Sequence, residues 1–138
     1  MVVNMAIDAA MPVLIVDDFH TMVRILRSLL AQLGFQDIDD ASDGGAALAK
    51  MRAKSYGLVI SDWNMSPMSG LDFLVEMRAD ARLADTRFIM VTAEGKIDSV
   101  IAARKAGVDS YIVKPFNAQS LRTKVEAACA LWRPSVPA

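Results

Sequence analysis

The sequence lacks several features that would indicate particular classes of protein. It contains one cysteine, Cys129, and one histidine, His20, among 138 residues. A single cysteine excludes an internal disulfide, and one cysteine with one distant histidine gives no basis for a Cys/His metal site or a catalytic thiol. We expect Cys129 to be a small core residue on the apolar side of a late helix.

Long apolar runs and blocks of like charge are also missing. No apolar run approaches the ~20 residues that a membrane-spanning helix requires, and residues 1–11 lack the basic start and apolar stretch of a secretory signal. The formal net charge is −1, with 22% charged residues, which does not favour a nucleic-acid or anionic-lipid surface. We therefore expect a cytoplasmic protein without membrane insertion or nucleic-acid partners.

What the sequence does contain is an alternation of short apolar runs and helical patterns. Hydrophobic residues make up 54% of the chain, enough for one domain with a sizeable core. The alternation predicts an α/β fold, a doubly wound five-stranded parallel sheet with five helices. We expect strands at 13–18, 36–41, 58–62, 88–92 and 111–115, and helices at 22–33, 46–51, 70–79, 97–106 and 121–132.

This organisation leaves no room for a second domain. We assign residues 1–11 to an N-terminal extension, 12–132 to the domain and 133–138 to a flexible C-terminal tail. Gly107 is expected to end the fourth helix. The acidic content of the second strand makes it the weakest of the five. We expect the domain to be a monomer.

Four of the apolar runs end in polar residues. The first leads into Asp17 and Asp18, and the others end at Asp62, Thr92 and Lys114. In a parallel sheet these residues emerge at the same carboxyl edge, where open α/β sheets place their sites. Clustered carboxylates suit Mg²⁺, and one carboxylate can act as a nucleophile toward phosphorus. The pattern therefore predicts a magnesium-assisted phosphoryl site.

Each of these residues taken alone has a structural explanation. Asp17 or Asp18 could cap the following helix, and Asp62 could be a turn residue. Thr92 and Lys114 are ordinary residues for a strand end. Their joint placement at four strand ends is harder to explain in this way and favours a functional site.

The chain resembles bacterial response-regulator receiver domains from about residue 12 to residue 132. Within that family it is most similar to the single-domain chemotaxis regulators of the CheY type, which have a flavodoxin-like fold. An acidic pair, a central Asp, a Thr and a Lys-Pro in this order carry the resemblance. The segments are 16–19 (VDDF) with 21–22 (TM), 59–65 (VISDWNM), 90–94 (MVTAE) and 111–116 (YIVKPF).

The resemblance implies a phosphoacceptor and a metal site. Asp62 matches the residue that takes a phosphoryl group from the phosphohistidine of a histidine kinase of the CheA type. Asp18 and Asp62 match direct Mg²⁺ ligands, with the backbone carbonyl of Asn64 as a third and Asp17 acting through water. The protein would then be a signalling phosphoprotein and not an enzyme, apart from its own phosphotransfer and autodephosphorylation.

The resemblance also implies a switch. Thr92 and Lys114 match the pair that senses the phosphoryl group, and Tyr111 matches an aromatic residue that turns inward when Thr92 is drawn toward that group. From the residues alone, Tyr111 reads as a half-buried strand aromatic. Asn64 and Glu94 occupy positions that tune how fast water removes the phosphoryl group.

Two details concern prolines near the site. The family usually has proline four residues after the phosphoacceptor, whereas this chain has Ser66 there, followed by Pro67. Ser69 replaces a common acidic residue, so we expect the loop beside the site to differ in shape or mobility. Lys114–Pro115 matches a peptide bond that is cis in the family.

The family's output face joins the fourth helix, fifth strand and fifth helix. Matching positions here include Lys96, Val100, Tyr111 and Lys124. The resemblance implies a flagellar motor switch protein or another downstream protein as the partner, with a phosphatase as a further one. From the residues alone, Lys96 and Lys124 read equally well as solvated charges.

Three other functions use a similar fold or chemistry. A phosphate sink or relay in a non-motor pathway uses the same site without a motor partner. A Mg²⁺-dependent phosphohydrolase of the haloacid-dehalogenase type places two aspartates one residue apart on its first strand, which the adjacent Asp17 and Asp18 do not match. A nucleotide-binding domain is disfavoured because no glycine-rich loop follows the first strand.

Overall fold

The fold is a five-stranded parallel sheet between two layers of helices. The computed structural model describes residues 9–93 and 95–130. The strand order is β2-β1-β3-β4-β5, with every neighbouring pair parallel. The strands are β1 (Val13–Val16), β2 (Ile38–Ala41), β3 (Leu58–Asp62), β4 (Arg87–Thr92) and β5 (Ser110–Val113). The helices are α1 (His20–Gln32), α2 (Gly44–Ala53), α3 (Gly70–Ala79), α4 (Ile97–Ala106) and α5 (Ala118–Cys129).

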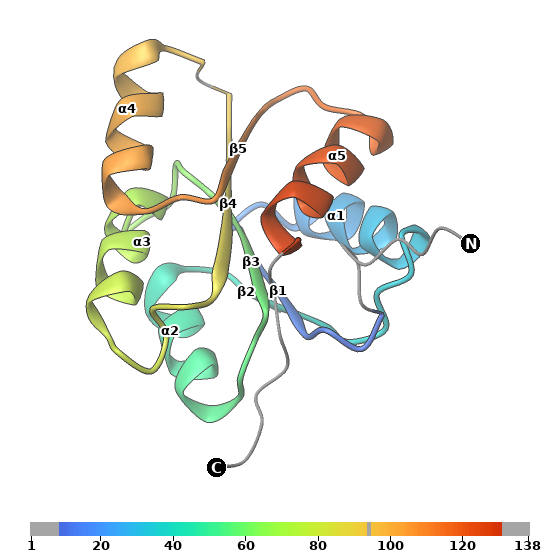
Figure 1. Ribbon diagram of the computed structural model, residues 1–138, viewed down its shortest axis with the longest axis horizontal. Coiled ribbons are helices and arrows are strands. Elements are labelled where there is room, and N and C mark those ends of the chain that lie inside the picture. The colour runs from blue at the N-terminus through green and yellow to red at the C-terminus, as the bar shows by residue number, and fades with distance from the viewer. Residues whose placement is uncertain (1–8, 94, 131–138) are drawn as a thin grey trace.

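The helices are divided between the two faces of the sheet, which confirms the predicted doubly wound α/β class. Figure 1 shows α1 and α5 on one side and α2, α3 and α4 on the other. Each face carries its own apolar cluster. No helix in the described part of the chain is long and apolar enough to cross a membrane.

The central strands are buried on both faces. Val13 and Ile15 pack in the cluster under α1 and α5, whereas Leu14 and Val16 pack in the cluster under α2 and α3. This two-sided burial explains why the strands read as continuous apolar runs without alternation. Met11 is also fully buried in the first cluster, so the core includes a residue that the sequence analysis assigned to the N-terminal extension.

All ten expected elements are present, but α5 (Ala118–Cys129) lies three residues earlier than the predicted 121–132, and several other limits differ by one or two residues. Helices α3 and α4 have the predicted limits, and Gly107 ends α4 in a left-handed conformation with φ 97°. Helix α1 begins at His20, two residues before its first apolar residue, because His20 and Thr21 occupy its first two positions. Strand β2 is shorter than predicted and starts at Ile38. Trp132 and the predicted tail 133–138 lie outside the described residues.

Polar side chains fix where three helices begin. Asp43 accepts the backbone N–H of Ala46 at the start of α2, and Ser69 accepts that of Asp72 at the start of α3. Asn117 and Ser120 form a reciprocal capping box in front of α5. These bonds satisfy donors that would otherwise lack partners in the first helical turn.

The free edge of β2 is covered by two cationic side chains. Successive backbone carbonyls of a strand point to opposite sides. Every second carbonyl along β2 accepts a backbone N–H on the side of β1. The carbonyls of Ile38 and Asp40 therefore point outward. Arg27 of α1 donates to the Ile38 carbonyl at 2.6 Å, and Lys50 of α2 donates to the Asp40 carbonyl. Each helical layer thus supplies one cation to this edge.

Arg78 joins three segments at the amino edge of the sheet, the edge where the strands begin. From the last turn of α3 it donates twice to the Gly107 carbonyl, at 3.0 and 2.9 Å. It also donates to the carbonyls of Ala84 and Thr86 and to Asp109 Oδ2 at 2.9 Å. One half-buried guanidinium therefore fixes the turn before β4 and the turn between α4 and β5.

A second polar group stands near the amino edge, beside β2. Lys54 Nζ lies 2.7 Å from Asp37 Oδ1 and 2.9 Å from Asp39 Oδ2. The buried Tyr56 donates its hydroxyl to Asp39 Oδ2 at 2.6 Å. Because of these two donors, Tyr56 first and Lys54 second, the pKa of Asp39 is held below its ordinary value.

Candidate functional site

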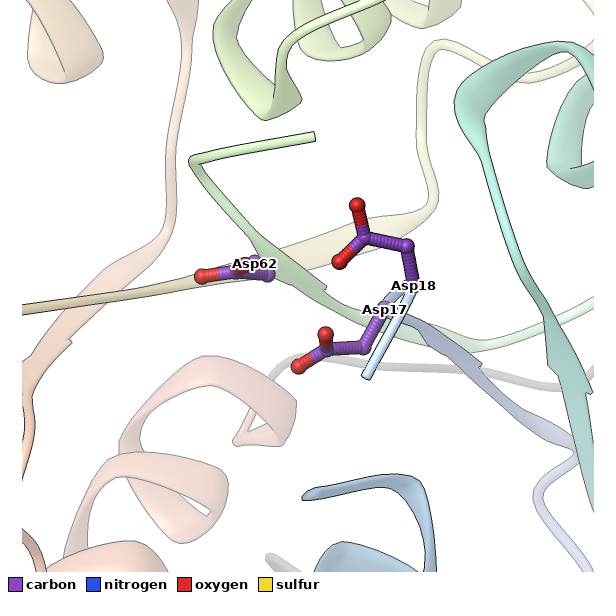
Figure 2. A group of neighbouring side chains, drawn as sticks. All are labelled: Asp17, Asp18 and Asp62. Carbon is purple, nitrogen blue, oxygen red and sulfur yellow. The ribbon is translucent and has the colours of Figure 1, made fainter. Parts of the chain in front are cut away.

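Three carboxylates meet at the carboxyl edge of the sheet, where the strands end. Asp17 and Asp18 follow β1, and Asp62 is the last residue of β3, the neighbouring strand. One carboxylate oxygen from each lies within 4.8 Å of the others. Figure 2 shows the Asp17 and Asp18 carboxylates, which leave one strand end, turned to the side on which Asp62 lies. The predicted convergence of these three residues is thus present.

Asp17 is buried in an unfavourable environment. Its exposed fraction is 3%, and Oδ2 has no hydrogen-bond partner among the described residues. Oδ1 accepts the backbone N–H of Phe19 at 2.9 Å. Burial, reinforced by the negative charge of Asp62, raises the pKa of Asp17, and the bond from Phe19 opposes this only in part. A cation beside Asp17 would relieve this cost.

Asp17 and Asp18 do not act as ordinary caps of α1. The N-cap residue of this helix is Phe19, and its side chain makes no capping bond. Among the described residues, the backbone N–H that donates to the Asp17 side chain is that of Phe19 itself, which precedes the first helical turn. The capping explanation of the acidic pair is therefore not supported by the contacts at this helix.

Lys114 supplies positive charge to the same place. It follows β5, and its Nζ lies 3.2 Å from Asp62 Oδ1. The backbone N–H of Lys114 donates to the Thr92 carbonyl at 2.7 Å, which ties the end of β5 to the end of β4. Asp62 is 7% exposed, so this ion pair lies in a region that water screens weakly. With all four groups ionised, three carboxylates face one ammonium.

The loop after β3 holds Asp62 by its backbone. The N–H of Trp63 donates to the Val91 carbonyl at 3.0 Å, and its carbonyl accepts the N–H of Gly70 at 2.8 Å. A Cβ on Gly70 would lie 2.2 Å from the Asp62 carbonyl oxygen. Such a contact is sterically impossible, so the close approach of α3 to the end of β3 requires glycine at this position.

Two other predicted site residues lie on the neighbouring strand and in the following loop. Thr92, 1% exposed, is the last residue of β4, the strand next to β3. Asn64 is exposed in the loop that follows Asp62. Lys114–Pro115 is cis, as the resemblance implies, and Ser66–Pro67 is cis as well. Glu94 lies outside the described residues.

Three of the four predicted output-face residues line one hollow of about 350 Å³. These are Val100 of α4, Tyr111 of β5 and Lys124 of α5, together with four other residues of the same region. Lys96 lies elsewhere, as the exposed N-cap residue of α4. Tyr111 is partly buried and also packs against the apolar cluster on the α2–α4 face.

Sequence reasoning missed one contact between the site and this face. The rings of Trp63 and Tyr111 meet edge to face, with centroids 6.3 Å apart and planes at 75°. The available signal was the alternation of side chains along β3, which places residues 61 and 63 on the same face of the sheet. The pairing of three strands is needed to bring Trp63 to Tyr111, and spacing alone does not provide it.

The donor set is suited to a hard divalent cation. Three carboxylates offer only oxygen ligands, and Asp17 Oδ2 is a buried acceptor without a described partner. Mg²⁺ takes one or two carboxylates and keeps other positions for water and phosphate oxygens. The residues present therefore fit Mg²⁺, and Lys114 stands where it could neutralise an anion bound beside the metal.

Comparisons with known proteins agree with this geometry. Residues 13–126 match the family model described as the response regulator receiver domain. The chemotaxis protein CheY of Pseudomonas aeruginosa is 48% identical over 116 residues, which cover 84% of this chain and 94% of that protein.

Solved structures give the same result. The chemotaxis protein CheY4 of Vibrio cholerae superposes with a TM-score of 0.81 at 29% identity, covering 87% of this chain and 99% of that one. The CheX–CheY–BeF₃–Mg²⁺ complex of Borrelia burgdorferi gives 0.78 at 31% identity, covering 83% and 86%. The chain belongs to the response regulator receiver family and is a CheY-like receiver domain.

Proposed function

We propose that this chain is a single-domain response regulator that is phosphorylated on Asp62 by a histidine kinase in the presence of Mg²⁺. The observation that carries the proposal is the meeting of Asp17, Asp18 and Asp62 within 4.8 Å, with Lys114 Nζ 3.2 Å from Asp62. A structural role alone would leave unexplained the buried Asp17 Oδ2, which has no hydrogen-bond partner among the described residues.

The reaction is an attack by Asp62 on phosphorus. A carboxylate oxygen of Asp62 forms an O–P bond while the N–P bond of the phosphohistidine breaks, and the released imidazole nitrogen takes up a proton. Lys114 neutralises one of the phosphoryl oxygens. Asp17, Asp18, Asp62 and the Asn64 carbonyl would hold Mg²⁺, which when bound supplies further positive charge beside those oxygens.

Signalling would follow from a change in the output face. Thr92 would donate its hydroxyl to the phosphoryl group, and Tyr111 would change its packing in response. Asn64 and Glu94 would set how fast water removes the phosphoryl group. This order of events is supported by the strand order. Thr92 ends β4, which lies between β3 and β5, the strand that carries Tyr111.

The partner bound by this face would be a chemotaxis protein. Lys96, Val100, Tyr111 and Lys124 would contribute to the contact, and a flagellar motor switch protein is the candidate. The proposal is supported by the relatives named above, which are chemotaxis proteins. Titration of a motor switch peptide against both forms separates this role from that of a phosphate sink, which gains no affinity on phosphorylation.

Intact mass spectrometry after treatment with a small acyl phosphate and Mg²⁺ tests the central claim. We expect one phosphoryl adduct in the wild type, none without Mg²⁺, and none in Asp62→Asn. Asp72→Asn is a matched control, because Asp72 is an exposed acid in the first turn of α3; its adduct should equal that of the wild type. An unmodified wild type, or an undiminished adduct in Asp62→Asn, would contradict the proposal.

A further inference from the structure

Trp63 directly follows Asp62, and its ring touches Tyr111 across the sheet. The two rings meet edge to face at 6.3 Å between centroids. Both are partly buried against the apolar cluster on the face covered by α2, α3 and α4. The strands that carry them, β3 and β5, are separated by β4. This contact therefore links the end of the phosphoacceptor strand to the output strand.

The strand register explains how the two rings reach each other. Ser61 pairs with Met90, and Met90 pairs with Tyr111, so these three residues form one row across the sheet. Trp63 lies two residues beyond Ser61 and thus points to the same face. Met90 is fully buried in that row, and the Trp63 ring reaches across β4 to meet the Tyr111 ring edge to face.

The backbone of Trp63 cannot move independently of the site. Its N–H is bonded to the Val91 carbonyl of β4, and its carbonyl is bonded to the N–H of Gly70 of α3. The Cα of Trp63 would lie 2.9 Å from a Cβ built on Gly70, so α3 packs directly against it. The point at which the indole side chain leaves the backbone is consequently fixed by the strand end that carries Asp62.

We propose that Trp63 is a positioning residue that holds the Tyr111 ring in its packed, partly buried position and so sets how often the output face adopts this form. The proposal rests on the proposed function, in which Tyr111 is the residue that responds to phosphorylation. An aromatic pair of this geometry shifts a two-state equilibrium by roughly three- to tenfold. Trp63 acts through Tyr111 and touches no reacting atom.

Fluorotyrosine labelling provides a direct test, because the chain contains two tyrosines. Tyr56 is buried and bonded to Asp39, so its ¹⁹F resonance is an internal reference. A neutral gadolinium chelate broadens the resonances of exposed rings. Unlike a chemical shift, this broadening does not change merely because the ring current of the indole has been removed.

We expect Trp63→Leu to increase the broadening of the Tyr111 resonance by about two- to fivefold, with Tyr56 unchanged. Trp63→Phe should give a smaller increase in the same direction, since a shorter ring keeps part of the contact; it decides the question if Trp63→Leu does not fold. Met65→Leu is the matched control, because Met65 lies in the same loop and packs on the same cluster. It should match the wild type.

Two outcomes overturn the role of Trp63. One is a Tyr111 broadening in Trp63→Leu that equals the wild type, and the other is an equal increase in Met65→Leu, which would indicate a general loosening of the loop. Phosphoryl adducts are measured on the same samples by intact mass. A wild type without an adduct contradicts the proposed function, whereas adducts in both proteins with unchanged Tyr111 broadening contradict only the role of Trp63.

Discussion

The two edges of the sheet treat their carboxylates differently. Near the amino edge, Asp109 accepts bonds from Arg78 and from the backbone N–H of Phe88, and Asp39 accepts bonds from Tyr56 and Lys54. At the carboxyl edge, three carboxylates lie together, Asp62 is paired with Lys114, and Asp17 Oδ2 has no partner among the described residues.

The acids of this small domain therefore fall into two kinds, those that stabilise the fold and those that we propose to form the functional site. Acids at the amino edge are neutralised by the chain itself and hold segments together. The acids at the carboxyl edge repel each other, Lys114 compensates only part of their charge, and a bound cation would compensate the rest. The comparison makes three predictions, in which the amino edge and the carboxyl edge respond differently to the same kind of change.

The largest effect is expected at the amino edge, from Arg78→Ala. The substitution removes the Arg78 donor from three carbonyls and from the carboxylate of Asp109, in a region where the Arg78 side chain is only 20% exposed. We expect the free energy of unfolding in urea to fall by about 3 kcal/mol. Arg82→Ala, at a side chain 71% exposed, should change it by less than about 0.5 kcal/mol. Equal losses of unfolding free energy in Arg78→Ala and Arg82→Ala would contradict the structural role of the bonds at the amino edge.

An intermediate effect is expected at the carboxyl edge from Mg²⁺. A ligand that binds only the folded state at about ten times its Kd raises the free energy of unfolding by about 1.4 kcal/mol. We expect this gain in the wild type and in Asp39→Asn, because Asp39 lies near the amino edge of the sheet and is not part of the acidic cluster. Asp18→Asn should reduce it, since Asp18 is an exposed member of the acidic cluster. The urea midpoint with and without Mg²⁺ measures each gain, and an unreduced gain in Asp18→Asn would argue against the cluster as the binding site.

The smallest effect, and the sharpest contrast, is expected from acid in the absence of Mg²⁺. Burial raises the pKa of Asp17 above its ordinary value of 3.8, so the folded state takes up this proton first. The contribution of Asp17 to stability therefore increases as the pH falls through the raised pKa. The pKa of Asp39 is lowered by Tyr56 and Lys54, so its contribution is complete above the ordinary value and is lost as the pH falls through the lowered pKa.

Two substitutions separate these opposite dependences of stability on pH. Asp17→Asn should remove the gain on acidification, and Tyr56→Phe should remove part of the loss while lowering the free energy of unfolding near neutral pH by about 1 kcal/mol. Asp39 is 36% exposed, so screening by water makes its slope shallow. Unfolding in urea between about pH 2 and 7 measures both, because the loss at Asp39 occurs below its ordinary pKa. If the contributions of Asp17 and Asp39 to the free energy of unfolding changed in the same direction with pH, the contrast between the two edges would be wrong.

Most of the fold could be predicted from the sequence because its signals are local. Two-sided burial makes the central strands short apolar runs, and Gly107 marks the end of α4 where a left-handed residue is needed. The limits of β2 were less predictable because Asp39 and Asp40 occupy half of it. Their charges are compensated by Tyr56, Lys54 and Arg27 from other segments, which spacing in the sequence does not indicate.

The candidate site also contains some features that the sequence predicts and others that it does not. Asp17, Asp62 and Lys114 could be placed together from sequence because parallel strands bring their carboxyl ends to one edge. The contact between Trp63 and Tyr111 depends on the register of three strands, and no local pattern contains that information. Glu94 stays a prediction, since it lies outside the described residues.

The covered edge of β2 has a consequence for assembly. A sheet grows when another chain pairs with the free carbonyls and N–H groups of its last strand. In this domain Arg27 and Lys50 occupy the outward carbonyls of Ile38 and Asp40, and a docking strand would have to displace a cation from each helical layer. Growth of the sheet into ordered aggregates is therefore opposed at this edge, even though the strands themselves are rich in valine and isoleucine.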